Sequence, residues 1–221
     1  SVSVEERTPE LRSELRAFMD VCCFAWFRDQ GSLDVIGEHP RAFVAPDITW
    51  LYPFDVVQPK PQGIAVCLRK QGDLIKETWQ RTLLAFKQPL HPWPFYFENG
   101  GDAGVFEEMF PALHVPKEFS LLPSQQASAV ISGRFHGLIF ALQMGLPVIT
   151  VSSRPKVRRF LAEHDLERWC VPEDEPETLA KLWPEFMASK NKLREQALWL
   201  RKKICAQVEH DAAQAKDELL S

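Results

Sequence analysis

The segment SAVISGRFHGLIFALQM, residues 128–144, contains two apolar stretches separated by a polar turn. Its first part, 128–132, is a short run of small and apolar residues, which predicts a buried strand. Gly133 lets the backbone turn tightly, and 135–144 is apolar on nearly every side, which predicts a buried helix. A second apolar strand is expected over 147–151. Buried strands that alternate with buried helices are typical of an α/β fold with a parallel sheet.

The alternation of strands and helices extends on both sides of this segment. Upstream, the sequence predicts a strand over 63–68, a helix that starts at Asp73 and a strand over 93–97. From Glu177 to the end the pattern is helical, and Pro184 is expected to kink or divide that region. Further helices are expected over 105–110, 123–127 and 156–164.

The amino-terminal part repeats the pattern on a smaller scale. Thr8 and Pro9 are a favourable helix start, so a helix is expected from about 9 to 20. A strand over 22–27, a short helix around 33–36 and a strand over 42–45 then form a βαβ unit. The segment 51–62 contains three prolines and no clean periodicity, which indicates a linker between two lobes.

Composition and charge exclude some functions. A net charge of −4 argues against a surface that neutralises nucleic-acid phosphates. Five cysteines without paired spacing, and no apolar run long enough to span a membrane, favour a cytoplasmic protein. Histidines without ligand spacing indicate no metal. The basic cluster 201–203 could contact an anionic membrane surface, although a solvated helix face is the favoured interpretation.

Three arginines follow predicted strands and are candidate ligands for an anion, namely Arg28, Arg69 and Arg134. Ligands of parallel α/β sheets bind at the carboxyl ends of the strands, where the following helices present free N–H groups. An arginine fork donates paired hydrogen bonds to phosphate or carboxylate, and His136 can exchange a proton near neutral pH. The structural alternative is that Arg134 forms a salt bridge and His136 caps the helix.

Several motifs occur in an order that resembles the polysaccharide pyruvyl transferase family. An Arg-Leu-His turn, a Gly-x-Pro strand and a Tyr-Asp-x-Lys loop of that family correspond to 134–136, 145–149 and 153–156 here. Three positions differ from the family pattern, because Ser153-Arg154 replaces Tyr-Asp and Phe135 replaces leucine. The remaining matching segments are GIAVCLR (63–69), FRDQGS (27–32) and APD (45–47).

The resemblance implies a GT-B-like pair of Rossmann-like lobes, of which the first is incomplete, as in a piece of a longer protein. It divides the chain into the remainder of the first lobe (1–58), a second lobe (59–172) and carboxyl-terminal helices (173–221). It also implies an enzyme of polysaccharide or exopolysaccharide biosynthesis. The donor is phosphoenolpyruvate, no cofactor is needed, and a saccharide acceptor becomes a ketal.

Residue roles follow from the same resemblance. Arg134 and His136 are the implied catalytic pair at the phosphate and carboxylate of the donor. Arg28, from the first lobe, and Lys156, on the loop, are the implied additional donor ligands, together with Arg69. The oligomeric state and the acceptor sugar are left open by the sequence.

Two other functions remain open at this stage. A nucleotide-sugar glycosyltransferase of GT-B fold would place the same turn against a diphosphate. That class usually carries a pair of glutamates in the second lobe, and Glu163 and Glu167 look solvated instead. A degenerate binding protein that keeps the fold without catalysis is the third hypothesis.

Overall fold

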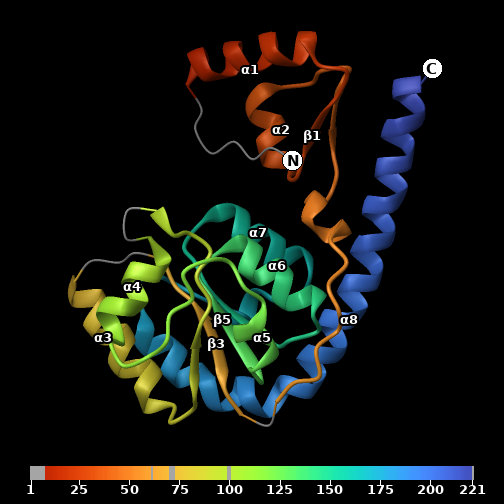
Figure 1. Cartoon of the computed structure of the whole chain (residues 1–221). Helices are drawn as coiled ribbons and strands as arrows, with labels where there is room; N and C mark the ends of the chain where they lie inside the picture. Colours follow the sequence, from red (N-terminus) through yellow and green to blue (C-terminus); the bar gives the residue numbers. More distant parts are fainter. Residues whose placement is uncertain (1–7, 61, 70–72, 99–100, 221) are drawn as a thin grey trace. The chain divides into compact units, whose positions relative to one another are not determined.

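The computed structural model describes residues 8–60, 62–69, 73–98 and 101–220. The chain forms two compact units. Unit 1 consists of residues 1–53 and 201–221, and unit 2 consists of residues 54–200. The long helix α8 (Pro176–Leu220), blue in Figure 1, belongs to unit 2 in its first part and to unit 1 in its last part.

Unit 2 is built on a five-stranded sheet in the order β4-β3-β5-β6-β7, with every neighbouring pair parallel. Each residue of β3, β5 and β6 is buried, which explains why their sequences are apolar apart from Ser132 and Thr150. The predicted α/β class with a parallel sheet is thus confirmed. The strands are β3 (Ile64–Cys67), β4 (Leu90–Pro92), β5 (Ala129–Ser132), β6 (Val148–Val151) and β7 (Cys170–Val171).

Helices pack around this sheet, as Figure 1 shows. The helices α3 (Asp73–Ala85) and α4 (Asp102–Met109) contact each other. The helices α6 (Phe135–Gln143) and α7 (Pro155–Glu163) contact each other through the rings of Phe135 and Phe160, which pack edge to face with centroids 5.5 Å apart. The short elements of the unit are α5 (Leu122–Gln125) and the 3-10 turn η3 (Glu167–Trp169).

A glycine turn joins α6 to β6 and is held by α8. Gly145 has a φ of 70°, a left-handed conformation that favours glycine. Its carbonyl accepts a hydrogen bond of 2.8 Å from Arg194 of α8, which also donates to the carbonyl of Val57 at 2.8 Å. One arginine therefore links three segments of unit 2 that are distant in sequence.

Unit 1 contains a parallel pair of short strands and the helices beside it. A buried cluster of Met19, Phe27 and Ile36 forms its centre. Thr8 and Asp29 cap the two helices, since each side chain accepts a hydrogen bond from a backbone N–H of the first turn. The elements are α1 (Pro9–Val21), β1 (Ala25–Phe27), α2 (Gln30–Ile36), β2 (Ala42–Val44) and the 3-10 turn η1 (Ile48–Leu51).

The strand predicted over 93–97 is wrong, because the strand lies at 90–92. The backbone N–H of Trp93 still donates to Val66 of β3, at 2.8 Å. Pro94 has no N–H, so pairing cannot continue past it. The chain then leaves the sheet toward α4.

The expectation that Pro184 divides the carboxyl-terminal region is also wrong, since α8 continues through it. Pro184 and Ala180 are both exposed, so water can solvate the carbonyl that loses its partner. Burial of Leu179, Trp183 and Phe186 on the other face offsets the lost hydrogen bond. Among the described residues, no helix combines the length with the apolar character needed to cross a membrane.

Candidate functional site

The candidate site lies at the carboxyl ends of the parallel strands of the unit 2 sheet. We call this end of the sheet its carboxyl edge. Polar groups follow four neighbouring strands there. They are Arg69 after β3, Arg134 after β5, Arg154 after β6 and Glu173 after β7. In a parallel sheet these positions come together, and this edge is where α/β proteins bind ligands.

The turn after β5 is closely packed against its neighbours. The hydroxyl of Ser132 donates to the carbonyl of Arg134 at 2.9 Å and accepts from the N–H of Arg134 at 3.3 Å. A Cβ at Gly133 would lie 3.2 Å from the carbonyl oxygen of Cys67, and one at Gly137 would lie 2.4 Å from Ser132 Oγ. The turn therefore needs glycine at both positions for steric reasons.

A buried carboxylate fixes the guanidinium of Arg134. Nε of Arg134 donates to both carboxylate oxygens of Asp102, at 3.2 and 3.0 Å, and Nη2 donates to Oδ1. Asp102 is fully buried, and it also accepts from the N–H of Phe95 at 3.1 Å. Nη1 of Arg134 donates to no residue that the structure describes, so one side of the fork can meet a ligand.

The local charges keep Arg134 strongly protonated. Burial lowers its pKa, but the hydrogen bonds and charge of Asp102 outweigh burial and raise the pKa above the ordinary value. The guanidinium carbon also lies 5.9 Å from the ring centre of Tyr96, within the range of a cation–π contact. Beneath the pair, burial and then the charge of Asp102 raise the pKa of the Cys67 thiol well above its ordinary value, so this thiol is neutral.

Arg69 is a second arginine of this edge. Its Nη1 lies 3.8 Å from Oε1 of Glu173, which is longer than a hydrogen bond. Burial, and then the positive charges of Arg154 and Arg134, lower the pKa of Arg69, and Glu173 and Asp102 oppose this shift. Arg154 and Arg134 are therefore each close enough to repel Arg69.

The balance of charge at this edge favours an anion. Three guanidinium groups meet two carboxylates, those of Asp102 and Glu173. Arg134 is the N-cap residue of α6, and no side chain caps this helix with a hydrogen bond. The positive end of the helix therefore adds to the arginine field.

The other two residues predicted in unit 2 also lie close in sequence to this edge. His136 is exposed in the first turn of α6, with its ring stacked on Phe140 at a centroid distance of 6.2 Å. Lys156 is half-buried in the first turn of α7, directly after Arg154 and Pro155. Both side chains thus start from helix ends that follow the carboxyl ends of β5 and β6.

Arg28 belongs to unit 1, whereas the other predicted site residues belong to unit 2. It follows β1, and its Nη1 donates to Oδ2 of Asp47 at 3.1 Å. Asp47 also caps η1, because its Oδ1 accepts from the N–H and the hydroxyl of Thr49 at 3.0 and 2.9 Å. The role of Arg28 beside the donor stays a prediction.

Two acidic residues of the edge were missed by sequence reasoning. Asp102 follows Gly101 at the start of a helix, a position at which aspartate is common for reasons of capping alone. Glu173 lies in the short turn between β7 and α8. Neither position carries a local pattern that distinguishes a partner for arginine from an ordinary surface acid.

Comparison with solved structures places the chain in a class of folds. The chain is similar to sucrose-phosphate synthase from Thermosynechococcus elongatus (TM-score 0.62, 14% identity, 99% of this chain and 64% of that one). It is also similar to TarM from S. aureus (0.61, 10%, 96% and 47%) and to the glycotransferase of kitacinnamycin (0.56, 16%, 94% and 61%). The fold is therefore that of the GT-B glycosyltransferases, and the chain spans about half to two thirds of their length.

The family is narrower than the fold. The family model for polysaccharide pyruvyl transferase matches residues 1–155, and the chain belongs to this family. No curated protein sequence matches the chain. The match includes the turn after β5 and ends one residue before Lys156, and it confirms the resemblance inferred from the motifs.

Proposed function

We propose that this protein transfers a pyruvyl group from phosphoenolpyruvate to hydroxyls of a glycan or glycan precursor, with formation of a ketal. Membership of the transferase family supports the reaction class. The observation that carries the proposal is the guanidinium of Arg134, fixed by buried Asp102 and open on its Nη1 side at the start of α6.

The proposed donor fits the charge of this edge. Phosphoenolpyruvate carries a tetrahedral phosphate and a planar carboxylate. Arginine binds both kinds of oxyanion through paired hydrogen bonds. Arg134 and Arg69 supply such donors from adjacent strands, β5 and β3. A bound anion also relieves the repulsion that lowers the pKa of Arg69.

The reaction removes one proton from each of two sugar hydroxyls, delivers one proton to C3 of the donor and leaves the other with the departing phosphate. A sugar hydroxyl forms a bond to C2 of the donor while C3 accepts a proton, and the hydroxyl proton leaves to a base. The C2–O bond to phosphate then breaks, and a neighbouring hydroxyl attacks C2 to close the ketal. We assign the proton transfers to His136, and the neutralisation of the departing phosphate to the arginines.

Arg154 is one of the residues that differ from the family pattern. It stands where the family carries aspartate, and its charge contributes to lowering the pKa of Arg69. We infer that it adds to the field that binds the donor anion. Lys156 completes the proposed set of donor ligands in unit 2.

The proposal is tested by calorimetric titration of the full chain with phosphoenolpyruvate. Arg134→Ala removes the fixed guanidinium, so the affinity is expected to fall by at least about a hundredfold. Arg154→Ala should lower it by about tenfold, because it removes one positive charge from the field around Arg69. The matched control is Arg168→Ala, since Arg168 is exposed and pairs with Glu185 at the surface.

Three outcomes contradict the proposal. One is no heat of binding with phosphoenolpyruvate, and another is equal loss of affinity in the Arg134→Ala and Arg168→Ala variants. The third is tighter binding of a nucleotide sugar such as UDP-glucose, which points to glycosyl transfer. Binding of phosphoenolpyruvate that is lost only in the site variants supports the proposal.

A further inference from the structure

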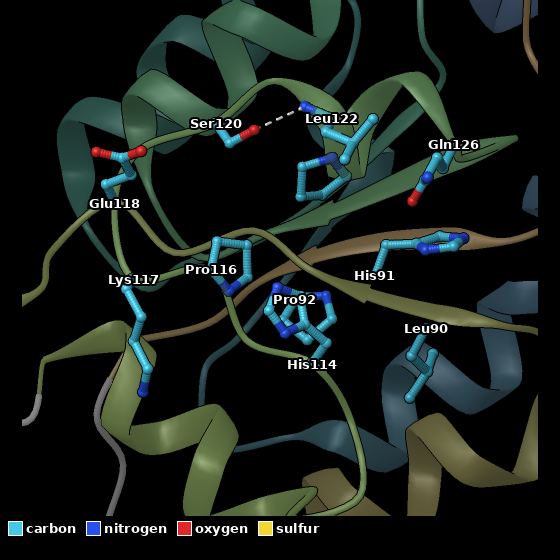
Figure 2. A pocket seen from close by; sticks show the side chains of 11 residues that line it. Leu90, His91, Pro92, His114, Pro116, Lys117, Glu118, Ser120, Leu122 and Gln126 are labelled. Atoms are coloured by element: carbon cyan, nitrogen blue, oxygen red, sulfur yellow. Dashed lines mark hydrogen bonds between the residues drawn. The ribbon is translucent and has the colours of Figure 1, made fainter.

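A pocket of unit 2 lies along β4, an edge strand of the sheet (Figure 2). It has a volume of about 580 Å³, which is in the range of small-ligand sites. The walls come from β4, from the loop that precedes α5 and from α5 itself. The apolar part of this β4 pocket is formed by Leu90, Pro92, Pro116, Leu122 and Pro123.

Four polar side chains of the β4 pocket have unused hydrogen-bonding capacity. The side chains of His91, His114 and Gln126 make no hydrogen bond to any residue that the structure describes. The hydroxyl of Ser120 accepts from the N–H of Leu122 at 3.2 Å, the dashed line in Figure 2, and likewise donates to no described residue. In Figure 2, His91 and Gln126 lie at one end of the hollow, with His114 beside Pro92.

The position of His91 is made possible by a glycine. Gly63 has a φ of 103°, and a Cβ there would lie 2.8 Å from Nε2 of His91. The imidazole thus lies against bare backbone on one side and faces the pocket on the other. Burial lowers the pKa of His91, so its ring is neutral near neutral pH and offers one donor and one acceptor.

The charges around the β4 pocket do not favour an anion. Lys117 forms an ion pair with Glu107, and in Figure 2 its ammonium points away from His91. Glu118 adds an exposed negative charge. Within the described part of the chain, the pocket also lacks a third ligand that would make a metal site with its two histidines.

The edge of β4 is also poorly suited to a peptide strand. β4 has three residues, and the last of them is Pro92, which has no N–H to donate to an added strand. A small molecule therefore fits the hollow better than an extended chain.

We propose that the β4 pocket binds a neutral saccharide unit. Sugar hydroxyls donate and accept, which matches the neutral imidazole of His91, a second imidazole, an amide and a hydroxyl. The flat proline and leucine surfaces match the C–H face of a sugar ring. The absence of an unpaired cation among the described lining residues selects against phosphorylated and acidic sugars. The pocket is a site separate from the turn after β5.

This inference deepens the proposed function and rests on it only for the source of the sugar. A glycan acceptor is longer than the unit that reacts, so a more distant neutral unit of the same chain can occupy the β4 pocket. Such a contact increases the local concentration of acceptor without a change at the reacting atoms.

The test uses histidine-detected ¹H–¹⁵N NMR of the full chain, with galactose, mannose, glucose and their neutral trisaccharides as probes. The imidazole signals of His91 and His114 should shift and saturate with at least one probe. His114→Ala and Gln126→Ala, both at exposed positions, should each weaken this binding by at least about fivefold. His210→Ala, exposed on α8, is the matched control and should leave it unchanged.

The outcomes separate this inference from the proposed function. No saturation at His91 and His114 up to about 100 mM of each probe overturns the inference. So does tighter binding of galacturonate than of galactose, because the pocket is then an anion site. Shifts at His136 alone place the sugar at the turn after β5, which overturns the inference and leaves the proposed function standing. Arg134→Ala should abolish phosphoenolpyruvate binding and leave the β4 pocket unaffected.

Discussion

The two units each contain an arginine that follows a strand and pairs with a buried aspartate, yet the pairs differ in design. Arg28 follows β1, is 14% exposed and pairs with Asp47, which also caps η1 through Thr49. Arg134 follows β5, is 30% exposed and is held through Nε and Nη2 by Asp102. The comparison indicates that Asp47 serves mainly local structure, whereas Asp102 orients an arginine whose remaining donor faces outward.

Removal of the two carboxylate charges should separate the pairs most clearly. Asp102→Asn leaves the Arg134 cation beside a neutral buried amide, and we expect the free energy of unfolding to fall by about 3 kcal/mol. Asp47→Asn should cost about half as much, about 1.5 kcal/mol, because asparagine still caps η1. Urea unfolding of the full chain followed by tryptophan fluorescence measures both values.

The comparison fails if the two variants unfold at the same urea concentration. Phosphoenolpyruvate binding provides a second readout, because loss of Asp102 frees the orientation of Arg134. A normal donor affinity in Asp102→Asn would show that the fixed orientation has no role in binding.

The turn after β5, which carries Arg134, depends on glycine at its helix start. Gly137→Ala places a methyl group 2.4 Å from Ser132 Oγ, and we expect it to lower the free energy of unfolding by about 2 kcal/mol. Gly104→Ala is the matched control within α4, because no atom lies within 4 Å of the added methyl. It should raise stability by about 0.5–1 kcal/mol, as alanine favours helix. Differential scanning calorimetry of both variants measures their unfolding temperatures. Equal shifts of the unfolding temperature would contradict the steric role of Gly137.

The smallest expected effect comes from exchange of arginine for lysine. An ammonium cannot reproduce the paired contacts of Nε and Nη2, so Arg134→Lys should destabilise the fold by about 1 kcal/mol. Arg28 meets Asp47 through its terminal Nη1, a contact that lysine can reach, and Arg28→Lys should cost less than about 0.5 kcal/mol. Urea midpoints measured side by side test this order, and the reverse order would reject it.

Part of the fold could be predicted from the sequence because its signals are local. The strands β3, β5 and β6 are almost wholly apolar and are bounded by glycine or proline, so their patterns predict them directly. The strand predicted over 93–97 was wrong because its aromatic content favours strands, whereas Pro94 prevents pairing. β7 has two residues and gives no signal of its own. The division of the chain at residues 58 and 172 stays a prediction.

The candidate site was predictable only in its cations. Arg134 and His136 follow a strand and a glycine, which is a local signal, and the family resemblance strengthened it. Asp102 is 32 residues away from Arg134, and Glu173 is 104 residues away from Arg69. Contacts of this kind depend on the order of strands in the sheet, and no local periodicity reports that order.

The division of α8 between the units has a consequence for biosynthesis. Unit 2 is one continuous stretch, residues 54–200, whereas unit 1 combines 1–53 with 201–221. A ribosome that has completed residue 200 has supplied all of unit 2. Residues 1–53 must still wait for the end of α8, where Cys205 Sγ lies 3.2 Å from the carbonyl oxygen of Trp50. Residues 1–53 are thus made before unit 2 but become complete only after it, and a premature stop before residue 201 leaves them without the last part of α8.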